Sequence, residues 1–234
     1  MPFFAIAFVI TAIMLRMYTK STNLTVVGLA VALLPVIWLL GLLPLIGYGI
    51  DPMSILVPFM IFSIGVSHAV QMTGAWKQDM RDGLGAKLAA ENAIRKLAIP
   101  GTLALLANAL GFMVIMQIDI PIVHELGVTA CLGVLLMIIT NKVFLPALLA
   151  NLRLEKKAME EKSGNVNGRN PTWWKVSAMA ESRPATITLI FSLALLAAGT
   201  YQSRHLRTGD IGTGAPELHA DSRYNLDNDN IISN

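Results

Sequence analysis

The residues of this chain that could carry chemistry are polar side chains inside long apolar stretches. His68 lies in the string SIGVSHAVQ, beside Ser67 and one helical turn before Gln71. Ser63, Ser67 and Gln71 recur every four residues, so on a helix they form a polar stripe with His68 on its flank. We expect this polar sector to face the interior of a helix bundle.

The imidazole of His68 has two interpretations. An imidazole titrates near neutral pH, which suits a proton relay when a partner or a water wire stabilises the cation. Ionisable groups inside membrane spans are functional candidates by default, because a central charge costs roughly 2.5–3.5 kcal/mol. Alternatively, a neutral histidine joins two helices through a hydrogen bond, aided by Ser67 and Gln71.

Other polar residues in apolar stretches are expected to support the structure. Asn108 could hydrogen-bond toward the span before it, but we favour a contact between helices for it and a structural role for Asn141. Lys142 can extend to the lipid headgroups. His124 and Glu125 are helical neighbours that do not share a face, so they are expected to solvate a helix end rather than bind metal.

The sequence contains no motif of an enzyme or of a cofactor site. It has no phosphate-binding glycine loop, no HExxH and no arrangement of a nucleophile with a base. Its one cysteine, Cys131, lies in an apolar run, so neither a disulfide nor a Cys-based zinc site can form within the chain. We therefore expect no catalytic residue, no metal and no cofactor.

The composition is that of a membrane protein. Of 234 residues, 54% are hydrophobic and 14% are charged, well below the roughly 25% charged residues of soluble domains. The mean hydropathy is +0.59. The net charge of +3 comes from basic residues clustered between apolar stretches and is not a nucleic-acid footprint.

The chain is expected to be an all-α integral membrane protein. A spanning helix needs about 20 largely apolar residues, and six segments qualify. They are residues 2–18, 24–48, 53–75, 98–118, 122–150 and 184–203. Between and after them we expect a surface helix at 77–97, a cytoplasmic loop at 151–183 and the start of a periplasmic domain at 204–234.

The distribution of Lys and Arg predicts the sidedness of the bundle. Basic residues follow the first, third and fifth spans, whereas the links GYGIDPMS and QIDIPIVHE contain none. The positive-inside bias therefore makes the first three sides cytoplasmic and the two links external. Residue 1 and the C-terminal tail would then be external, and a missing upstream helix would explain the external start. We therefore expect a fragment of a longer protein.

Three strings carry a family resemblance: IGVSHAVQ, NALGFMVIMQIDIPIVHELGVTACLGVLLMIITNKVFLPALL and GDIGTGAPELHADSRYNLDND. Their order and spacing resemble the resistance-nodulation-division (RND) exporters, in particular the branch with the large-membrane-protein (MMPL) or sterol-sensing-like domain. The resemblance covers most of the chain. It implies a protein of twelve spans in two similar halves, of which this chain would supply spans two to seven.

The resemblance implies export of lipidic or hydrophobic substrates, driven by the proton-motive force, at a bacterial inner membrane. Members commonly carry acidic residues in the fourth span, often next to a Tyr, that bind the driving proton. Ser67 and His68 stand at the matching place. Either His68 takes over the proton role, or this half of the protein has no proton coupling.

The expected partners follow from the same resemblance. They are membrane lipids, a hydrophobic or lipidic substrate, the remaining half of the transporter and, as a further option, a second copy of the chain; nucleic acid is not among them. Two other functions remain open. One is a sterol-sensing-like module that binds lipid or regulates a partner, and the other is a scaffold half that needs a partner chain.

Overall fold

The computed structural model describes residues 2–49, 54–153, 182–206 and 221–232, and within these ranges all regular secondary structure is helical. The chain divides into two compact units, Met1–Gly164 and Asn165–Asn234. Within the described residues, five helices are long and apolar enough to span a membrane: Thr22–Ile46, Leu56–Arg81, Ala86–Ile115, Pro121–Ala150 and Pro184–Ser203. The prediction of an all-α membrane protein is confirmed.

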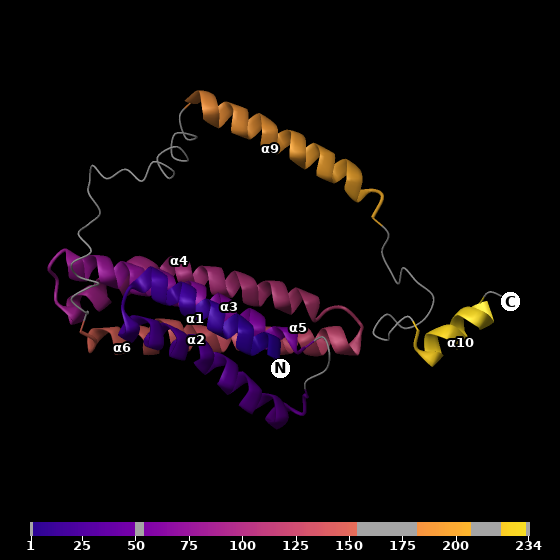
Figure 1. Ribbon diagram of the computed structural model, residues 1–234, viewed down its shortest axis with the longest axis horizontal. Coiled ribbons are helices and arrows are strands. Elements are labelled where there is room, and N and C mark those ends of the chain that lie inside the picture. Colours follow the sequence, from indigo (N-terminus) through magenta and orange to yellow (C-terminus); the bar gives the residue numbers. More distant parts are fainter. Residues whose placement is uncertain (1, 50–53, 154–181, 207–220, 233–234) are drawn as a thin grey trace. The chain divides into compact units, whose positions relative to one another are not determined.

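The first unit is a bundle of long helices that pack along their lengths (Figure 1). Its elements are α1 (Pro2–Thr19), α2 (Thr22–Leu42), η1 (Leu43–Ile46), α3 (Leu56–Arg81), α4 (Ala86–Ile115), α5 (Pro121–Ile139), η2 (Thr140–Phe144) and α6 (Leu145–Ala150). The short 3₁₀-helix η1 continues α2, and the π-helical turn η2 joins α5 to α6. The segment at residues 2–18 corresponds to α1, whose stretch Phe4–Thr19 is apolar but shorter than the five candidate spans. That it crosses a membrane stays a prediction.

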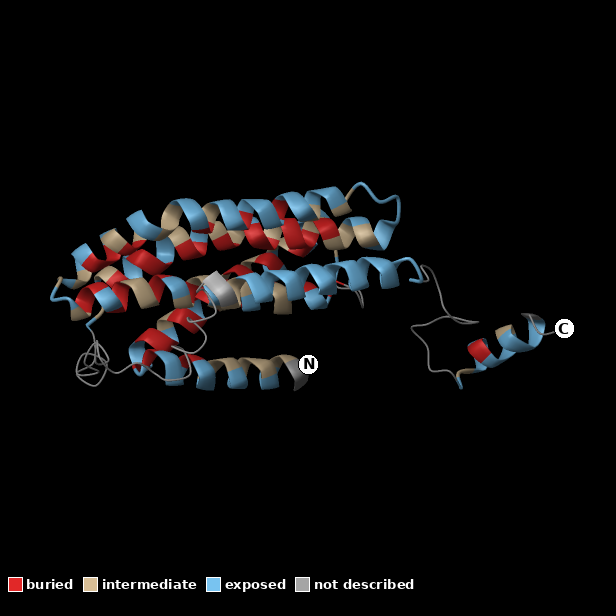
Figure 2. Ribbon diagram, turned by 90° about the horizontal axis from the view of Figure 1, so that it is seen from above, coloured by how far each residue is buried: buried red, intermediate tan, exposed pale blue. Residues whose placement is uncertain are grey.

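The buried side chains of the bundle form two clusters. The larger one joins α2, α3, α4 and α5 and includes Leu39, Ile61, Leu105 and Val134. The second surrounds Trp76, where α3, α4 and α6 meet. Buried residues lie on the inward faces of the helices (Figure 2).

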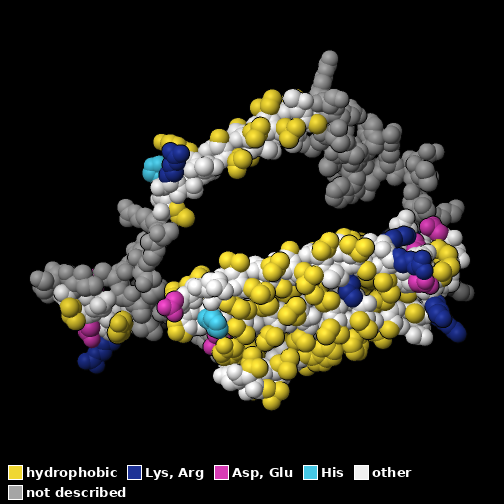
Figure 3. All heavy atoms as spheres, turned by 180° about the vertical axis from the view of Figure 1, so that it is seen from behind, with side chains coloured by type: hydrophobic (Ala, Val, Ile, Leu, Met, Phe, Trp, Pro, Cys, Tyr) yellow, Lys and Arg dark blue, Asp and Glu magenta, His cyan; other side chains and the backbone are white. Residues whose placement is uncertain are grey.

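The outward faces of the bundle are largely apolar. Hydrophobic side chains cover most of the visible surface of the bundle, and charged side chains gather mainly at its ends (Figure 3). Val9, Ile13, Leu103 and Leu110 are examples of outward side chains that are more than half exposed. Such a surface matches hydrocarbon rather than water as the surrounding solvent.

The expected surface helix at 77–97 is not a separate element. Helix α3 continues to Arg81, and α4 begins at Ala86 after a turn in which Gly83 has a φ of +91°. The indole of Trp76 donates a 3.0 Å hydrogen bond to the carbonyl of Ala86 and closes this turn. The charged residues of 77–97 therefore belong to two long helices and to the turn between them.

Two polar contacts show which links lie at the same end of the bundle. The ammonium of Lys77 donates to the carbonyl of Thr19 at 2.8 Å, so the α1–α2 turn meets the end of α3. The backbone N–H of Gly49 donates to the Glu125 carboxylate at 3.1 Å, so the α2–α3 link meets the start of α5. The distribution of Lys and Arg predicts the same grouping: the two segments joined by each contact are expected on the same side of the membrane.

The second unit contains α9 (Ser182–Ser203) and α10 (Arg223–Ile232). Helix α9 corresponds to the segment predicted at 184–203. None of the apolar stretch of this helix that could span a membrane is buried. The predicted loop at 151–183 lies mostly outside the described residues, as does part of the predicted periplasmic start at 204–234.

Candidate functional site

The polar stripe on α3 does not face the bundle interior. Ser63, Ser67 and Gln71 are exposed, and His68 is half-buried. The expectation of an inward polar sector is therefore corrected for the described unit: the stripe lies on the outward side of α3, and only His68 turns toward a neighbouring helix.

The inward face of α3 is instead formed by apolar and small residues. Gly65 and Ala69 are buried there. A β-carbon at Gly65 would lie 3.2 Å from the Cα of Ala32, so the absence of a side chain lets α3 approach the backbone of α2. Small residues permit such close approach between membrane helices. Close packing, rather than the polar stripe, therefore determines which side of α3 is inside.

His68 meets two residues from other elements. Gly101 is buried on α4, and a β-carbon there would lie 3.7 Å from Nδ1 of His68 and 3.2 Å from Cε of Lys142. The same β-carbon would collide with Nζ of Lys142. The imidazole and the ammonium therefore share the space that the missing side chain of Gly101 leaves.

The ammonium of Lys142 is held by a backbone carbonyl. It donates a 2.9 Å hydrogen bond to the carbonyl of Leu97, one turn before Gly101 on α4. The sequence predicted that Lys142 extends to the headgroups; the structure shows it reaching across to a second helix.

Two prolines lie in the backbone near this contact. Pro146 cannot donate a backbone hydrogen bond, and in a regular helix its ring would collide with the carbonyl four residues earlier, that of Lys142. The wider π-helical turn η2, Thr140–Phe144, stands at this place, and such turns recur at functional sites. Pro100 lies next to Gly101 inside α4 and likewise lacks a backbone donor, but α4 runs without a break from Ala86 to Ile115. The aromatic ring of Phe144 packs edge-on against Trp38 of α2, with ring centroids 5.6 Å apart, and holds η2 in place.

The charges around this contact are unevenly compensated. Arg95 pairs with Glu91 at 2.7 Å, and Lys96 pairs with Asp79 at 2.8 Å. Among the described residues Lys142 has no carboxylate partner, and His68 makes no hydrogen bond. The contact between His68 and Lys142 is thus a cationic site, and the ammonium of Lys142 has N–H donors that no described residue uses.

The two amides that the sequence analysis named lie apart from this centre. Asn141 is buried; its Nδ2 donates to the carbonyl of Met137 at 3.3 Å, and its Oδ1 has no hydrogen-bond partner among the described residues. Asn108 is exposed on α4. Within the described part of the chain, neither amide shares a hydrogen bond with His68, Ser67 or Gln71.

An apolar groove between α1 and α3 was not foreseen from the sequence. It has a volume of about 270 Å³ and is lined by Thr11, Met14, Leu15, Tyr18, Val66 and Val70. The hydroxyl of Tyr18 lies over Gly74, where a β-carbon would be 2.9 Å from it. The spacing of the α1 residues predicts a shared face, but the partner helix could be assigned only from the tertiary structure.

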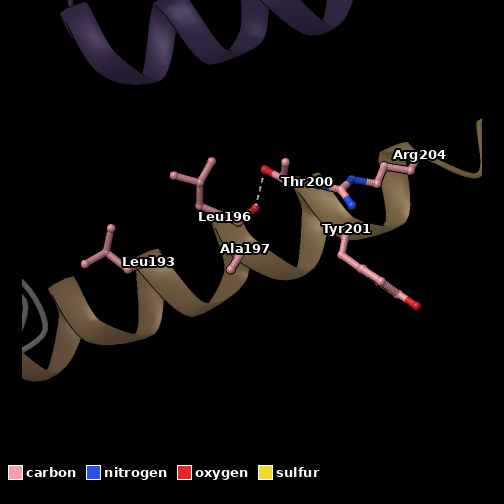
Figure 4. A pocket seen from close by; sticks show the side chains of 6 residues that line it. All are labelled: Leu193, Leu196, Ala197, Thr200, Tyr201 and Arg204. Carbon is pink, nitrogen blue, oxygen red and sulfur yellow. Dashed lines mark hydrogen bonds between the residues drawn. The ribbon is translucent and has the colours of Figure 1, made fainter.

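A second hollow lies on α9 in the second unit. It is lined by Leu193, Leu196, Ala197, Thr200, Tyr201 and Arg204 and measures about 440 Å³ (Figure 4). The hydroxyl of Thr200 donates to the carbonyl of Leu196 at 2.8 Å. Because the lining residues come from one exposed helix and the residue that follows it, this hollow is an open surface rather than an enclosed site.

Residues of the types that bind metal lie scattered in the part of the chain that the structure describes. No three His, Cys, Asp or Glu side chains come together there as a metal site. His124 is exposed, and Glu125 accepts the hydrogen bond from Gly49.

Comparison with known proteins assigns a family to most of this bundle. Residues 17–166 match the family described as "Sterol-sensing domain of SREBP cleavage-activation". A relative from Methanocaldococcus jannaschii, named "Putative membrane protein", is 21% identical over 137 residues, which cover 58% of this chain and 35% of that protein. The chain thus spans about a third of the length of the relative. No solved structure matches the present chain.

Proposed function

We propose that this chain, which belongs to the sterol-sensing domain family, is a membrane module that binds a lipid molecule in the groove between α1 and α3. The observation that carries the proposal is the groove itself. It lies between α1 and the outward side of α3, and its walls are mostly aliphatic. A ligand dissolved in the bilayer could enter it sideways without crossing water.

The groove fits part of a flat or linear apolar molecule. Ligand sites commonly join apolar walls to a few polar groups that fix orientation. Here Tyr18 supplies the polar group: it is 55% exposed, and its phenol forms no hydrogen bond with another described residue. The phenol could therefore pair with the hydroxyl of a lipid whose apolar body contacts Val66 and Val70.

The proposal is tested by filling the groove. In the chain reconstituted in vesicles, a photoactivatable sterol and a photoactivatable fatty-acyl lipid should each be tested for crosslinking to α1 or α3. We expect Val66→Trp to reduce crosslinking at least several-fold. Val26→Trp is the matched control, because Val26 is 59% exposed on α2 and does not line the groove. Equal crosslinking in both variants would contradict the proposal.

A second candidate function is the one that the RND resemblance implies: proton-driven export of a lipidic or hydrophobic substrate at a bacterial inner membrane. The observation that favours it is the position of His68 beside Lys142, both within candidate membrane spans. Ionisable residues within membrane spans commonly mark ion or proton pathways. On this proposal the remaining half of the transporter is the partner of the chain.

Export in the full-length protein distinguishes this candidate from simple lipid binding. We expect His68→Ala to abolish proton-coupled export while leaving the amount of protein in the membrane unchanged. His124→Ala is the control, since His124 lies exposed near the start of α5. Undiminished export by His68→Ala would rule out a relay through this residue.

A further inference from the structure

We propose that Lys142, together with His68 and Gly101, forms a binding site for the anionic phosphate headgroup of a membrane phospholipid. The site is separate from the α1–α3 groove. Val66 and Val70 line that groove, whereas His68 lies about 200° around α3 from Val66 at 100° per residue. The two sites therefore occupy different sides of the same helix.

The charge balance of the site calls for an anion. The neighbouring cations Arg95 and Lys96 each have a carboxylate within 2.8 Å. Among the described residues, the ammonium of Lys142 has one hydrogen-bond partner, the carbonyl of Leu97. An ammonium has three N–H donors, so two remain for a ligand. An oxyanion could accept from both and would supply the missing countercharge.

The level of the site along the bundle fits a headgroup. The carbonyl that holds Lys142 belongs to Leu97, which directly follows Arg95 and Lys96. Both of these side chains are more than half exposed, as expected where a helix leaves the hydrocarbon. Each basic residue near an anionic membrane surface contributes attraction for acidic lipid.

The surroundings leave room for the headgroup and for acyl chains. Lys142 and His68 are each half-buried, and Gly101 presents no side chain between them. Exposed apolar side chains stand near the site in sequence on two of the three contributing elements: Ile99 and Leu103 on α4, and Val143 on η2. A phospholipid could therefore place its phosphate at Lys142 with its chains against these residues.

The experiment measures lipid selectivity of the whole chain. The protein is reconstituted in phosphatidylcholine vesicles with a minor fraction of spin-labelled phosphatidylglycerol or spin-labelled phosphatidylcholine, and the protein-bound fraction of each is compared. We expect Lys142→Met to lower the preference for phosphatidylglycerol about fivefold, the factor for losing one cation at a lipid surface. Lys142→Arg should retain most of the preference. Lys96→Met is the matched control, because Lys96 is a cation at the same level with a carboxylate partner.

A second variant leaves the cation in place. Gly101→Ala puts a methyl group in collision with Nζ of Lys142, so it should displace the ammonium and lower the preference as Lys142→Met does. Unchanged selectivity in both Lys142→Met and Gly101→Ala would overturn the proposal. So would an equal loss in Lys96→Met, which would indicate general surface charge. Displacement of the bound lipid by millimolar inorganic phosphate would assign the site to free anions and also overturn it.

Discussion

The ammonium of Lys77, near the end of α3, donates a 2.8 Å hydrogen bond to the carbonyl of Thr19, the last residue of α1. Both residues are buried. The final carbonyls of a helix lack partners within that helix and attract cations. One lysine thus ties the α1–α2 turn to a helix that is distant in sequence.

Removal of this ammonium should destabilise the bundle. We expect Lys77→Met to lower the free energy of unfolding by about 1.5–3 kcal/mol, the usual contribution of a hydrogen bond to a charged group. Unfolding in mixed detergent micelles, followed by circular dichroism, gives the value. Lys87→Met is the control because Lys87 is exposed. An equal, small effect of both substitutions would show that the Thr19 contact contributes little.

The neighbouring ion pair should contribute less than the Lys77 contact. Asp79 is buried and pairs with Lys96, whose side chain is 57% exposed. Because water can solvate Lys96 after the pair is broken, we expect Asp79→Asn to cost less than about 1 kcal/mol. The same unfolding measurement tests it. A loss as large as that of Lys77→Met would mean that the pair is a main support of this end of the bundle.

Gly133 should be far more sensitive to substitution than Gly111. A β-carbon at Gly133 would lie 2.7 Å from Cδ1 of Ile61, which is fully buried, and 3.1 Å from Cδ2 of Leu39. At Gly111 there is nothing within 4 Å. Overpacking of this kind costs about 1–3 kcal/mol, so Gly133→Ala should destabilise by that amount.

Gly111→Ala is the matched control for this substitution and should leave the stability within about 0.5 kcal/mol. Thermal unfolding of both variants in the same detergent makes the comparison. Equal stability of the two variants would contradict the three-helix contact at Gly133.

Cysteine labelling tests the sidedness of the bundle. In a Cys131→Ser background, cysteines at Gly49 and Asp119 should react with a membrane-impermeant maleimide from the external side. A cysteine at Asp82, in the turn between α3 and α4, should react only from the cytoplasmic side. The contact between Gly49 and Glu125 explains why the first two sites share a side. Labelling of Gly49→Cys and Asp82→Cys from the same side would overturn the topology.

The sequence by itself determined where the helices lie and which links share an end of the bundle. Apolar stretches long enough to span a bilayer must form helices, because hydrocarbon offers the backbone no other hydrogen-bond partners. The contact of Gly49 with Glu125 brings two of the predicted external links to one end of the bundle, and the membrane side of that end stays a prediction. The boundary between α3 and α4 was harder to predict from the sequence, since the charged residues at 77–97 fit a surface helix as well as two helix ends.

Only the tertiary structure decided which side of each helix is inside. In water an apolar face marks the core, but in lipid the inside and the outside of a bundle are both apolar, so hydrophobicity does not separate them. On α3 the small residues Gly65 and Ala69 face inward, and the polar stripe at Ser63, Ser67 and Gln71 faces outward. The meeting of His68 with Lys142 likewise depends on the backbone at Gly101, on a third segment of the chain.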